Sequence, residues 1–267
     1  MRIAVVAPSC PLDPTAVPIL EGRARAAGVD LDVHPQCFSR SGHFAGADAE
    51  RLSALLEVLG NDSVDGVWFA RGGYGSNRIA ETAAASLPAT SRAKLIMGYS
   101  DAGFLLSALH RAGVSVAHGP LAQDALREGG SAAVDRALAY FKDRDPSALE
   151  GDIADDRPTL AVNLEVLVSM LGTPIAPRLA GCELLIEEVA EHLYAIDRAM
   201  FMLTSQQERP ASLRLGRVSD VPPNDPDFGE EVEAMVRRWC ARGGIDYRGR
   251  ADIGHDADNK VVPFSPR

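Results

Sequence analysis

The first 142 residues repeat one pattern, in which a short apolar run precedes an amphipathic stretch of helical length. The pattern occurs five times, with apolar runs RIAVVAP, LDVHP, GVWFA, KLIMG and VSVAHGP. Parallel strands need crossover connections of this length, and such crossovers are right-handed. We therefore predict an N-terminal doubly wound, mostly parallel α/β sheet domain with helices on both faces. Ligands bind at the carboxyl ends of such strands, so the strand-to-helix turns are the places to search for function.

The remainder of the chain is organised differently. Residues 143–160 are polar, rich in Asp and Pro, and without periodicity, which is typical of a linker. We predict an N-terminal domain at 1–145, a linker at 146–160 and a smaller C-terminal α/β domain at 161–267. In that last part the pattern predicts helices in NLEVLVSMLG, YAIDRAMFMLTSQQ and EEVEAMVRRWCARG, strands in ELLIEEV and SLRLGRV, and a non-periodic tail.

Composition excludes several classes of function. With 27 Lys and Arg against 37 Asp and Glu, the net charge is −10, which argues against a nucleic-acid partner. No window approaches the roughly 18 apolar residues of a membrane helix, and the apolar stretch after Arg2 is too short for a signal sequence. The four cysteines are scattered without a CxxC pair, so we expect reduced thiols in a cytoplasmic protein.

The turn after KLIMG reads GYSDAG, residues 98–103. A serine on such a turn is lifted from the sheet, and the next N–H, that of Asp101, points from the helix N-terminus toward a developing oxyanion. The second glycine lies one place later than in the usual nucleophile elbow, GxSxG. The alternative is that Ser100 or Asp101 simply caps the helix that starts near residue 102.

A second candidate turn, RGGYGS at residues 71–76, follows GVWFA. Its three glycines allow positive φ angles and let backbone N–H groups approach a ligand. It matches neither GxGxxG nor the phosphate loop that ends in GK[ST], so a tight turn without a ligand remains the alternative.

A serine nucleophile needs a base, and the chain has six histidines. His110 lies within the helix that follows Ser100, and His118 ends a predicted strand, where a structural role is the commoner one. His255 lies in the irregular polar segment IGHDADN, where a loop can hold a side chain and leave it accessible. The acidic neighbours of His255 leave a metal cluster open as an alternative, although no second histidine or cysteine lies near.

An acid to orient the histidine is available in ELLIEEV, which ends in the Glu187–Glu188 pair. Adjacent residues of a strand face opposite sides, so only one of the two can point toward a site. Without a further observation, both glutamates are expected to be solvated surface charges.

Taken together in this order, these stretches resemble the LD-carboxypeptidase family, serine peptidases of murein recycling that include microcin-immunity-type members. The similar segments span nearly the whole chain and are APSCP (7–11), ARGGYGSNR (70–78), IMGYSDAG (96–103), HGP (118–120), NLEVLVSMLGTP (163–174), LLIEEVAEHLYAIDR (184–198) and GHDADNKVVPF (254–264). The resemblance implies an N-terminal α/β domain and a smaller C-terminal α/β domain with the active site between them, in a homodimer.

The resemblance also implies a role for each matching residue. The nucleophile is then Ser100, the acid Glu187 and the general base His255, with oxyanion donors at the backbone N–H groups of Gly73 and Asp101. The implied reaction is hydrolysis of the amide before a terminal D-Ala in muropeptides, with no metal or organic cofactor. Apart from the resemblance, the candidate substrate contacts are Arg71, Tyr74 and Arg198; the two arginines suit the terminal carboxylate, and a structural ion pair is the alternative for each of them.

Two other functions stay open on the sequence alone. The first is an immunity-type hydrolase of peptidyl or aminoacyl sulfamoyl adenylates, for which an aromatic platform is expected on a loop of the second domain. The segment 142–160 contains no aromatic residue, which weighs against it. The second is a catalytically silent ligand-binding module of the same fold. The chain departs from the family pattern at positions that bear on the substrate pocket: Ala161, Val162, Leu193 and Ser265.

Overall fold

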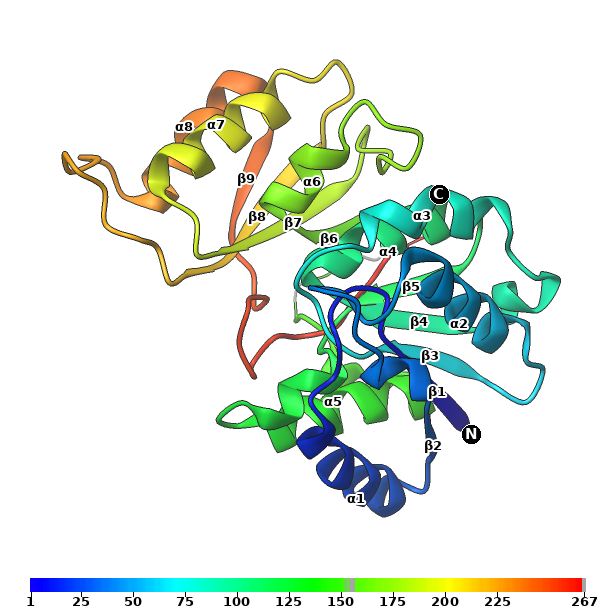
Figure 1. The fold of residues 1–267 in the computed structure, drawn as a ribbon. Helices are drawn as coiled ribbons and strands as arrows, with labels where there is room; N and C mark the ends of the chain where they lie inside the picture. Colours follow the sequence, from blue (N-terminus) through cyan, green and yellow to red (C-terminus); the bar gives the residue numbers. More distant parts are fainter. Residues whose placement is uncertain (152, 154–156, 266–267) are drawn as a thin grey trace.

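The computed structural model describes residues 1–151, 153 and 157–265, and these residues form two β-sheets with flanking helices (Figure 1). The first sheet has six strands in the order β10-β5-β4-β3-β1-β2, and the second has four in the order β6-β7-β8-β9. Neighbouring strands run parallel in both sheets, except that β10 is antiparallel to β5. The predicted fold class is confirmed.

The elements follow the chain in an alternating order. The first sheet and its helices comprise β1 (Arg2–Val6), α1 (Val17–Ala27), β2 (Asp30–Val33), α2 (Asp48–Gly60), β3 (Gly66–Phe69), α3 (Asn77–Ala85), β4 (Leu95–Gly98), α4 (Gly103–Arg111), β5 (Ser115–His118), α5 (Gly130–Asp143) and β10 (Val262–Pro263). The second sheet and its helices comprise β6 (Thr159–Asn163), α6 (Leu164–Met170), β7 (Glu183–Val189), α7 (Leu193–Thr204), β8 (Ser212–Ser219), α8 (Val232–Gly243) and β9 (Asp246–Arg250). Short 3₁₀ segments lie at Pro14–Ala16, Pro35–Phe38, Ala89–Ala93, Ser100–Ala102, Ala122–Leu126 and Pro146–Ala148.

Alternate residues of the central strands have their side chains buried on opposite faces of the first sheet. In β1, Ile3 and Val5 belong to the core that contains α1 and α5, whereas Ala4 and Val6 belong to the core that contains α2, α3 and α4. The two groups of helices lie on the two sides of this sheet in Figure 1. A strand buried on both faces reads as a continuous apolar run, which is why RIAVV predicts it.

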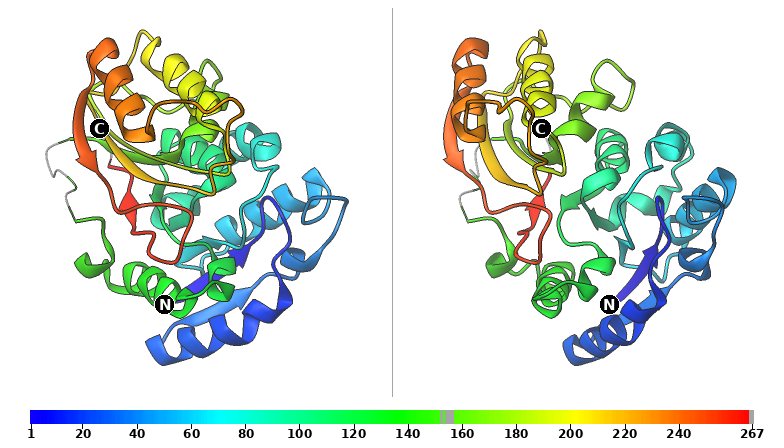
Figure 2. Two further views of the ribbon diagram at one scale, coloured as in Figure 1. Left: turned by 90° about the vertical axis from the view of Figure 1, so that its left-hand side faces the viewer. Right: turned by 60° about the vertical axis from the view of Figure 1, so that its left-hand side comes forward.

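The second sheet carries α6, α7 and α8 on one face (Figures 1 and 2). Its strands β6, β7 and β8 share one apolar core with α4 of the first sheet. Helix α6 packs on α4, where a Cβ on Gly103 would come 3.0 Å from Cγ1 of Val166. The absence of a side chain at Gly103 therefore lets the two sheets approach closely at the end of the Ser100 turn.

The end of the chain returns to the first sheet. Val262 pairs with His118 of β5, and the backbone N–H of Phe264 bonds to the carbonyl of Val116. Strand β6 begins at Thr159, inside the expected linker, and a buried ion pair joins Glu150 of that linker to Arg214 of β8, with Nη1 2.6 Å from Oε2. Residues 152, 154–156 and 266–267, which belong to the expected linker and tail, lie outside the described residues.

The sequence pattern did not predict the strands β9 and β10. Strand β9 reads DYRGR and lies at an edge of the second sheet, where alternate residues are exposed. Its composition is polar, so the sequence lacks the apolar run that would predict a strand. Strand β10 is a two-residue strand that forms only because β5 offers an edge to pair with.

Candidate active site

Ser100 lies on the turn between β4 and α4, where its backbone is strained. Its φ angle is 61°, a left-handed conformation that is rare for non-glycine residues and is concentrated at functional sites. The turn is tight enough that a Cβ on Gly98 would come 3.2 Å from Cβ of Ala102. No side chain caps the N-terminus of α4. Of the two readings of GYSDAG, the structure has the sharp, strained turn and not the N-cap.

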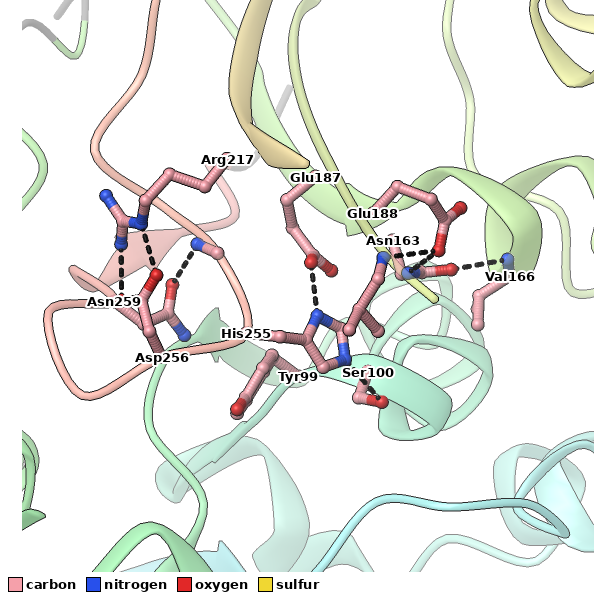
Figure 3. Close-up of polar contacts among 12 residues, drawn as sticks. Tyr99, Ser100, Asn163, Val166, Glu187, Glu188, Arg217, His255, Asp256 and Asn259 are labelled. Carbon is pink, nitrogen blue, oxygen red and sulfur yellow. Dashed lines mark hydrogen bonds and ion pairs between the residues drawn. The ribbon is translucent and has the colours of Figure 1, made fainter. Parts of the chain in front are cut away.

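A hydrogen-bonded chain joins Ser100 to two side chains from distant parts of the sequence (Figure 3). Nε2 of His255 lies 3.0 Å from Oγ of Ser100, and Nδ1 of the same ring contacts Oε2 of Glu187. Glu187 comes from β7, and His255 from the loop between β9 and β10. The ring of Tyr99 packs edge-on against the imidazole, with 4.9 Å between centroids. Three residues expected from the sequence thus meet at the edge where β4 and β7 end.

Burial and charge act in opposite directions on His255. Burial by itself disfavours the imidazolium, but the adjacent Glu187 carboxylate outweighs it and raises the pKa of His255 above its ordinary value. Glu187 is fully buried, and its Oε1 has no hydrogen-bond partner among the described residues. The geometry therefore suits a base that takes up a proton from Ser100 and is held as a cation by Glu187.

The loop that carries His255 is tied down on both sides. Asp256 forms a two-pronged ion pair with Arg217 of β8, whose Nη2 is 2.8 Å from Oδ1. On the other side Oδ1 of Asn259 accepts the backbone N–H of Gly254 and lies 3.1 Å from Nε2 of His118. His118 is buried, and burial lowers its pKa to about 4, so it is a neutral structural partner of this loop.

The glycine-rich turn lies against Ser100. Gly73 has a φ angle of 103°, and a Cβ there would come 2.3 Å from Sγ of Cys10, so only glycine fits. A Cβ on the preceding Gly72 would come 3.0 Å from Oγ of Ser100. Both expected oxyanion donors, Gly73 and Asp101, line the same cavity as Ser100.

Sequence reasoning missed what the side chain of Asp101 does. This buried carboxylate accepts the backbone N–H groups of Gly75 and Ser76, at 3.3 and 2.8 Å, and the hydroxyl of Ser9 at 2.5 Å. It therefore fixes the glycine-rich turn to the residue that follows Ser100. A signal was present in principle, because a buried acid directly after a nucleophile has to find donors nearby.

Glu188 is not the solvated surface charge that its position at a strand end predicts. It is 3% exposed and accepts hydrogen bonds from Nδ2 of Asn163 at 2.6 Å and from the backbone N–H of Glu165 at 2.8 Å. Burial raises its pKa to about 7. The register between β7 and β8 shifts between Ile186 and Glu188. Through its hydrogen bond to the backbone of Glu165, Glu188 fixes the first turn of α6.

Two cavities meet at Ser100 and separate the expected substrate contacts. Tyr74, which is 49% exposed, lines the larger cavity, and Arg71 lines the smaller one. Arg198 lines neither of these two cavities; it is exposed on α7, with its guanidinium 5.8 Å from the ring centroid of Tyr194, and its contact with a substrate stays a prediction. Sequence reasoning also missed Arg127, which lines the smaller cavity.

Within the described residues, no group of three or more metal-ligating side chains comes together. In the segment 254–259, the Asp256 carboxylate instead serves its own loop, through Arg217 and the backbone N–H of Asp258. Among the described helices, none combines the length and apolar character needed to cross a membrane.

Comparison with known proteins identifies the family of the chain. The LD-carboxypeptidase N-terminal domain matches residues 3–119, and the LD-carboxypeptidase C-terminal domain matches residues 158–266. The chain is 31% identical to a probable murein peptide carboxypeptidase of Bacillus subtilis, over 99% of this chain and 87% of that protein. It is 26% identical to the murein tetrapeptide carboxypeptidase of Pseudomonas aeruginosa, over 98% and 91%.

Solved structures share the fold. The muramoyltetrapeptide carboxypeptidase from Oxalobacter formigenes superposes with a TM-score of 0.81 at 24% identity, covering 99% of this chain and 93% of that one. The microcin C7 self immunity protein MccF superposes with a TM-score of 0.76 at 16% identity, covering 100% and 96%. With both family domains matched in order along its length, the chain belongs to the LD-carboxypeptidase family of serine peptidases.

Proposed function

We propose that this protein is a serine LD-carboxypeptidase that hydrolyses the amide between meso-diaminopimelate and the terminal D-Ala of murein tetrapeptides. The observation that carries the proposal is the hydrogen-bonded chain from Ser100 through His255 to Glu187, at the junction of two cavities. Membership of the family and the murein carboxypeptidase names of two relatives support the substrate class.

In the first half of the reaction, neutral His255 accepts the Ser100 proton at Nε2 as Oγ attacks the carbonyl carbon of the scissile amide. The Nδ1–H of His255 donates to Glu187, which fixes the tautomer and stabilises the imidazolium. The tetrahedral oxyanion accepts the N–H groups of Gly73 and Asp101, each of which contributes about 3 kcal/mol. Collapse of the intermediate transfers the His255 proton to the departing nitrogen and releases D-Ala.

In the second half, water replaces the amine. His255 removes a proton from that water, whose oxygen attacks the acyl-enzyme carbonyl, and the proton then passes to Oγ of Ser100 as the tripeptide leaves. The strained φ of Ser100 keeps Oγ pointing away from the sheet in both halves. Every proton moves between side chains of this chain, substrate and water, so we expect no metal or organic cofactor to be required.

The family resemblance further supports a cytoplasmic homodimer with a muropeptide as its substrate and with neither nucleic acid nor membrane as a partner. The net charge of −10 fits that absence of nucleic acid. Light scattering after size-exclusion chromatography tests the dimer directly, and a mass equal to a single chain would refute it.

Stereochemistry gives the sharpest test of the proposed function. The purified enzyme is compared on L-Ala-γ-D-Glu-meso-diaminopimelate-D-Ala and on its L-Ala-terminated diastereomer, with released alanine followed by chromatography. An L residue held by the same carboxylate moves its methyl group and displaces the carbonyl, and about 1 Å of displacement costs roughly a hundredfold in rate. Equal rates, or release from the L-terminated peptide only, would refute the LD-carboxypeptidase function even if Ser100 is the nucleophile.

A further inference from the structure

The two cavities beside Ser100 form one divided site. Ser100, Gly73 and His255 line both of them, so each cavity extends from the reacting atoms in its own direction. The larger has a volume of about 490 Å³ and the smaller about 330 Å³. A peptide whose scissile carbonyl lies at Oγ of Ser100 must place its acyl part in one cavity and its leaving residue in the other.

The two cavities differ in charge. Glu165 and Glu191 line the larger cavity, and no Lys or Arg lines it among the described residues. Glu188 and Asp101 line it too, but both are buried and their oxygens are engaged in hydrogen bonds. Arg71 and Arg127 line the smaller cavity. The charge contrast across Ser100 gives the site a direction, because a free carboxylate is attracted to the second cavity and repelled from the first.

Both arginines have charge available for a ligand. Nη1 of Arg71 lies 3.3 Å from the carbonyl of Pro11, a neutral partner, and the side chain is exposed. Arg127 donates through Nε to Asp124 at 2.7 Å and leaves 44% of its side chain exposed.

Asp124, the acid in this cavity, has its oxygens already engaged. Beyond Arg127 it accepts the backbone N–H of Leu121 at 2.8 Å and the hydroxyl of Tyr99 at 3.2 Å. It is 2% exposed, so it holds Arg127 in place more than it faces a ligand. Leu121 and Leu126 add apolar surface of the kind that a methyl group needs.

We propose that the cavity lined by Arg71 and Arg127 binds the terminal carboxylate of the leaving residue, and that the acyl part extends from Ser100 into the larger cavity. This assignment rests on the proposed function, and it explains why the enzyme removes a terminal residue rather than cutting within a peptide. Arginine suits the task because its planar donors match the two oxygens of a carboxylate.

A substrate and enzyme cycle tests the assignment. The tetrapeptide with a free C-terminal carboxylate is compared with the same peptide ending in D-alaninamide, on wild type, Arg71→Gln and Arg127→Gln. Wild type is expected to prefer the free acid by at least about tenfold in kcat/KM, the usual scale of one charge-assisted hydrogen bond. Each variant is expected to lose activity on the acid and little on the amide, so the preference shrinks.

The controls separate recognition from folding. Arg25→Gln, on the exposed side of α1, is expected to keep the wild-type preference. Arg127→Lys keeps a charge beside Asp124 and is expected to retain more of the preference than Arg127→Gln. Equal wild-type rates on acid and amide, or an equal loss on both peptides in the variants, would overturn the assignment.

Failure of the proposed function gives a different result. If wild type cleaves neither peptide, that function is wrong, and binding to Ser100→Ala by calorimetry then tests the cavity alone. Tighter binding of the acid than of the amide, reduced by Arg71→Gln, would still support the carboxylate site. Equal binding, or none, would overturn it.

Discussion

Replacement of Glu187 by Gln exchanges one carboxylate oxygen of the proposed triad for an NH₂ group and leaves the volume of the side chain nearly unchanged. When the Gln amide turns its NH₂ toward Nδ1 of His255, the imidazole proton has to reside on Nε2. Nε2 is then a donor and can no longer accept the proton of Ser100. Loss of the same kind of contact in a comparable triad costs about 10⁴ in rate, or about 5.5 kcal/mol of barrier. We expect kcat/KM on the tetrapeptide to fall by about that factor.

The same change should move the pH profile. Glu187 is what raises the pKa of His255 against the effect of burial, so the acidic limb of kcat/KM should shift to lower pH in Glu187→Gln. The fold should survive, because Oε1 of Glu187 makes no hydrogen bond that Gln would lose. Rates measured from pH 5 to 9, with the melting temperature at each pH, test both statements.

Glu188→Gln is the matched control for this experiment. Glu188 accepts only from N–H donors, so a Gln there would set its own NH₂ against one of them and cost about 1–3 kcal/mol of stability. Its loss of activity should be far smaller than that of Glu187→Gln. An activity loss below about tenfold in Glu187→Gln, or one matched by Glu188→Gln, would refute the role given to Glu187.

The other predictions concern the serine, the oxyanion turn, pH and metals. Ser100→Ala should abolish D-Ala release without lowering the melting temperature, since it removes a hydroxyl and keeps the Cβ; retained turnover would reject the nucleophile. Gly73→Ala should reduce kcat by about 10²–10³, because its Cβ would collide with Cys10 and displace one donor; an unchanged kcat would exclude that N–H. The protonated His255 stabilises the fold fully below the unfolded pKa of about 6.5, and this stabilisation should disappear as pH rises through the higher folded pKa. A pH series of melting temperatures on His255→Gln and wild type checks it, and parallel curves would contradict it. EDTA should leave the rate unchanged, and a loss restored by Zn²⁺ would favour the metal alternative at 254–259.

Local pattern was enough to predict the N-terminal sheet and to single out the turn at 98–103, whereas the role of Ser100 as nucleophile came from the family resemblance and stays a prediction. The apolar runs of β1, β3, β4 and β5 are buried on both faces of the sheet. The stretches of sequence between these strands have the periodicity of amphipathic helices. The turn at 98–103 could be singled out because its two glycines, its serine and the preceding apolar run are neighbours in the sequence, whereas the strained φ of Ser100 was seen only in the structure. Hydrophobic periodicity and turn-forming residues are local signals that extend over a few residues. They can therefore be recognised in a single sequence without knowledge of tertiary contacts.

The site as a whole depends on contacts that no local pattern contains. His255 reaches Ser100 across 155 positions of sequence, and it does so because β10 pairs with β5 and draws the 254–259 loop over the end of the first sheet. The sequence by itself determined which residue types were available for catalysis. Only the tertiary structure decided that Glu188 is buried and that Arg127 lines a cavity together with Arg71 and Ser100, because burial and direction are set by which distant surfaces pack together.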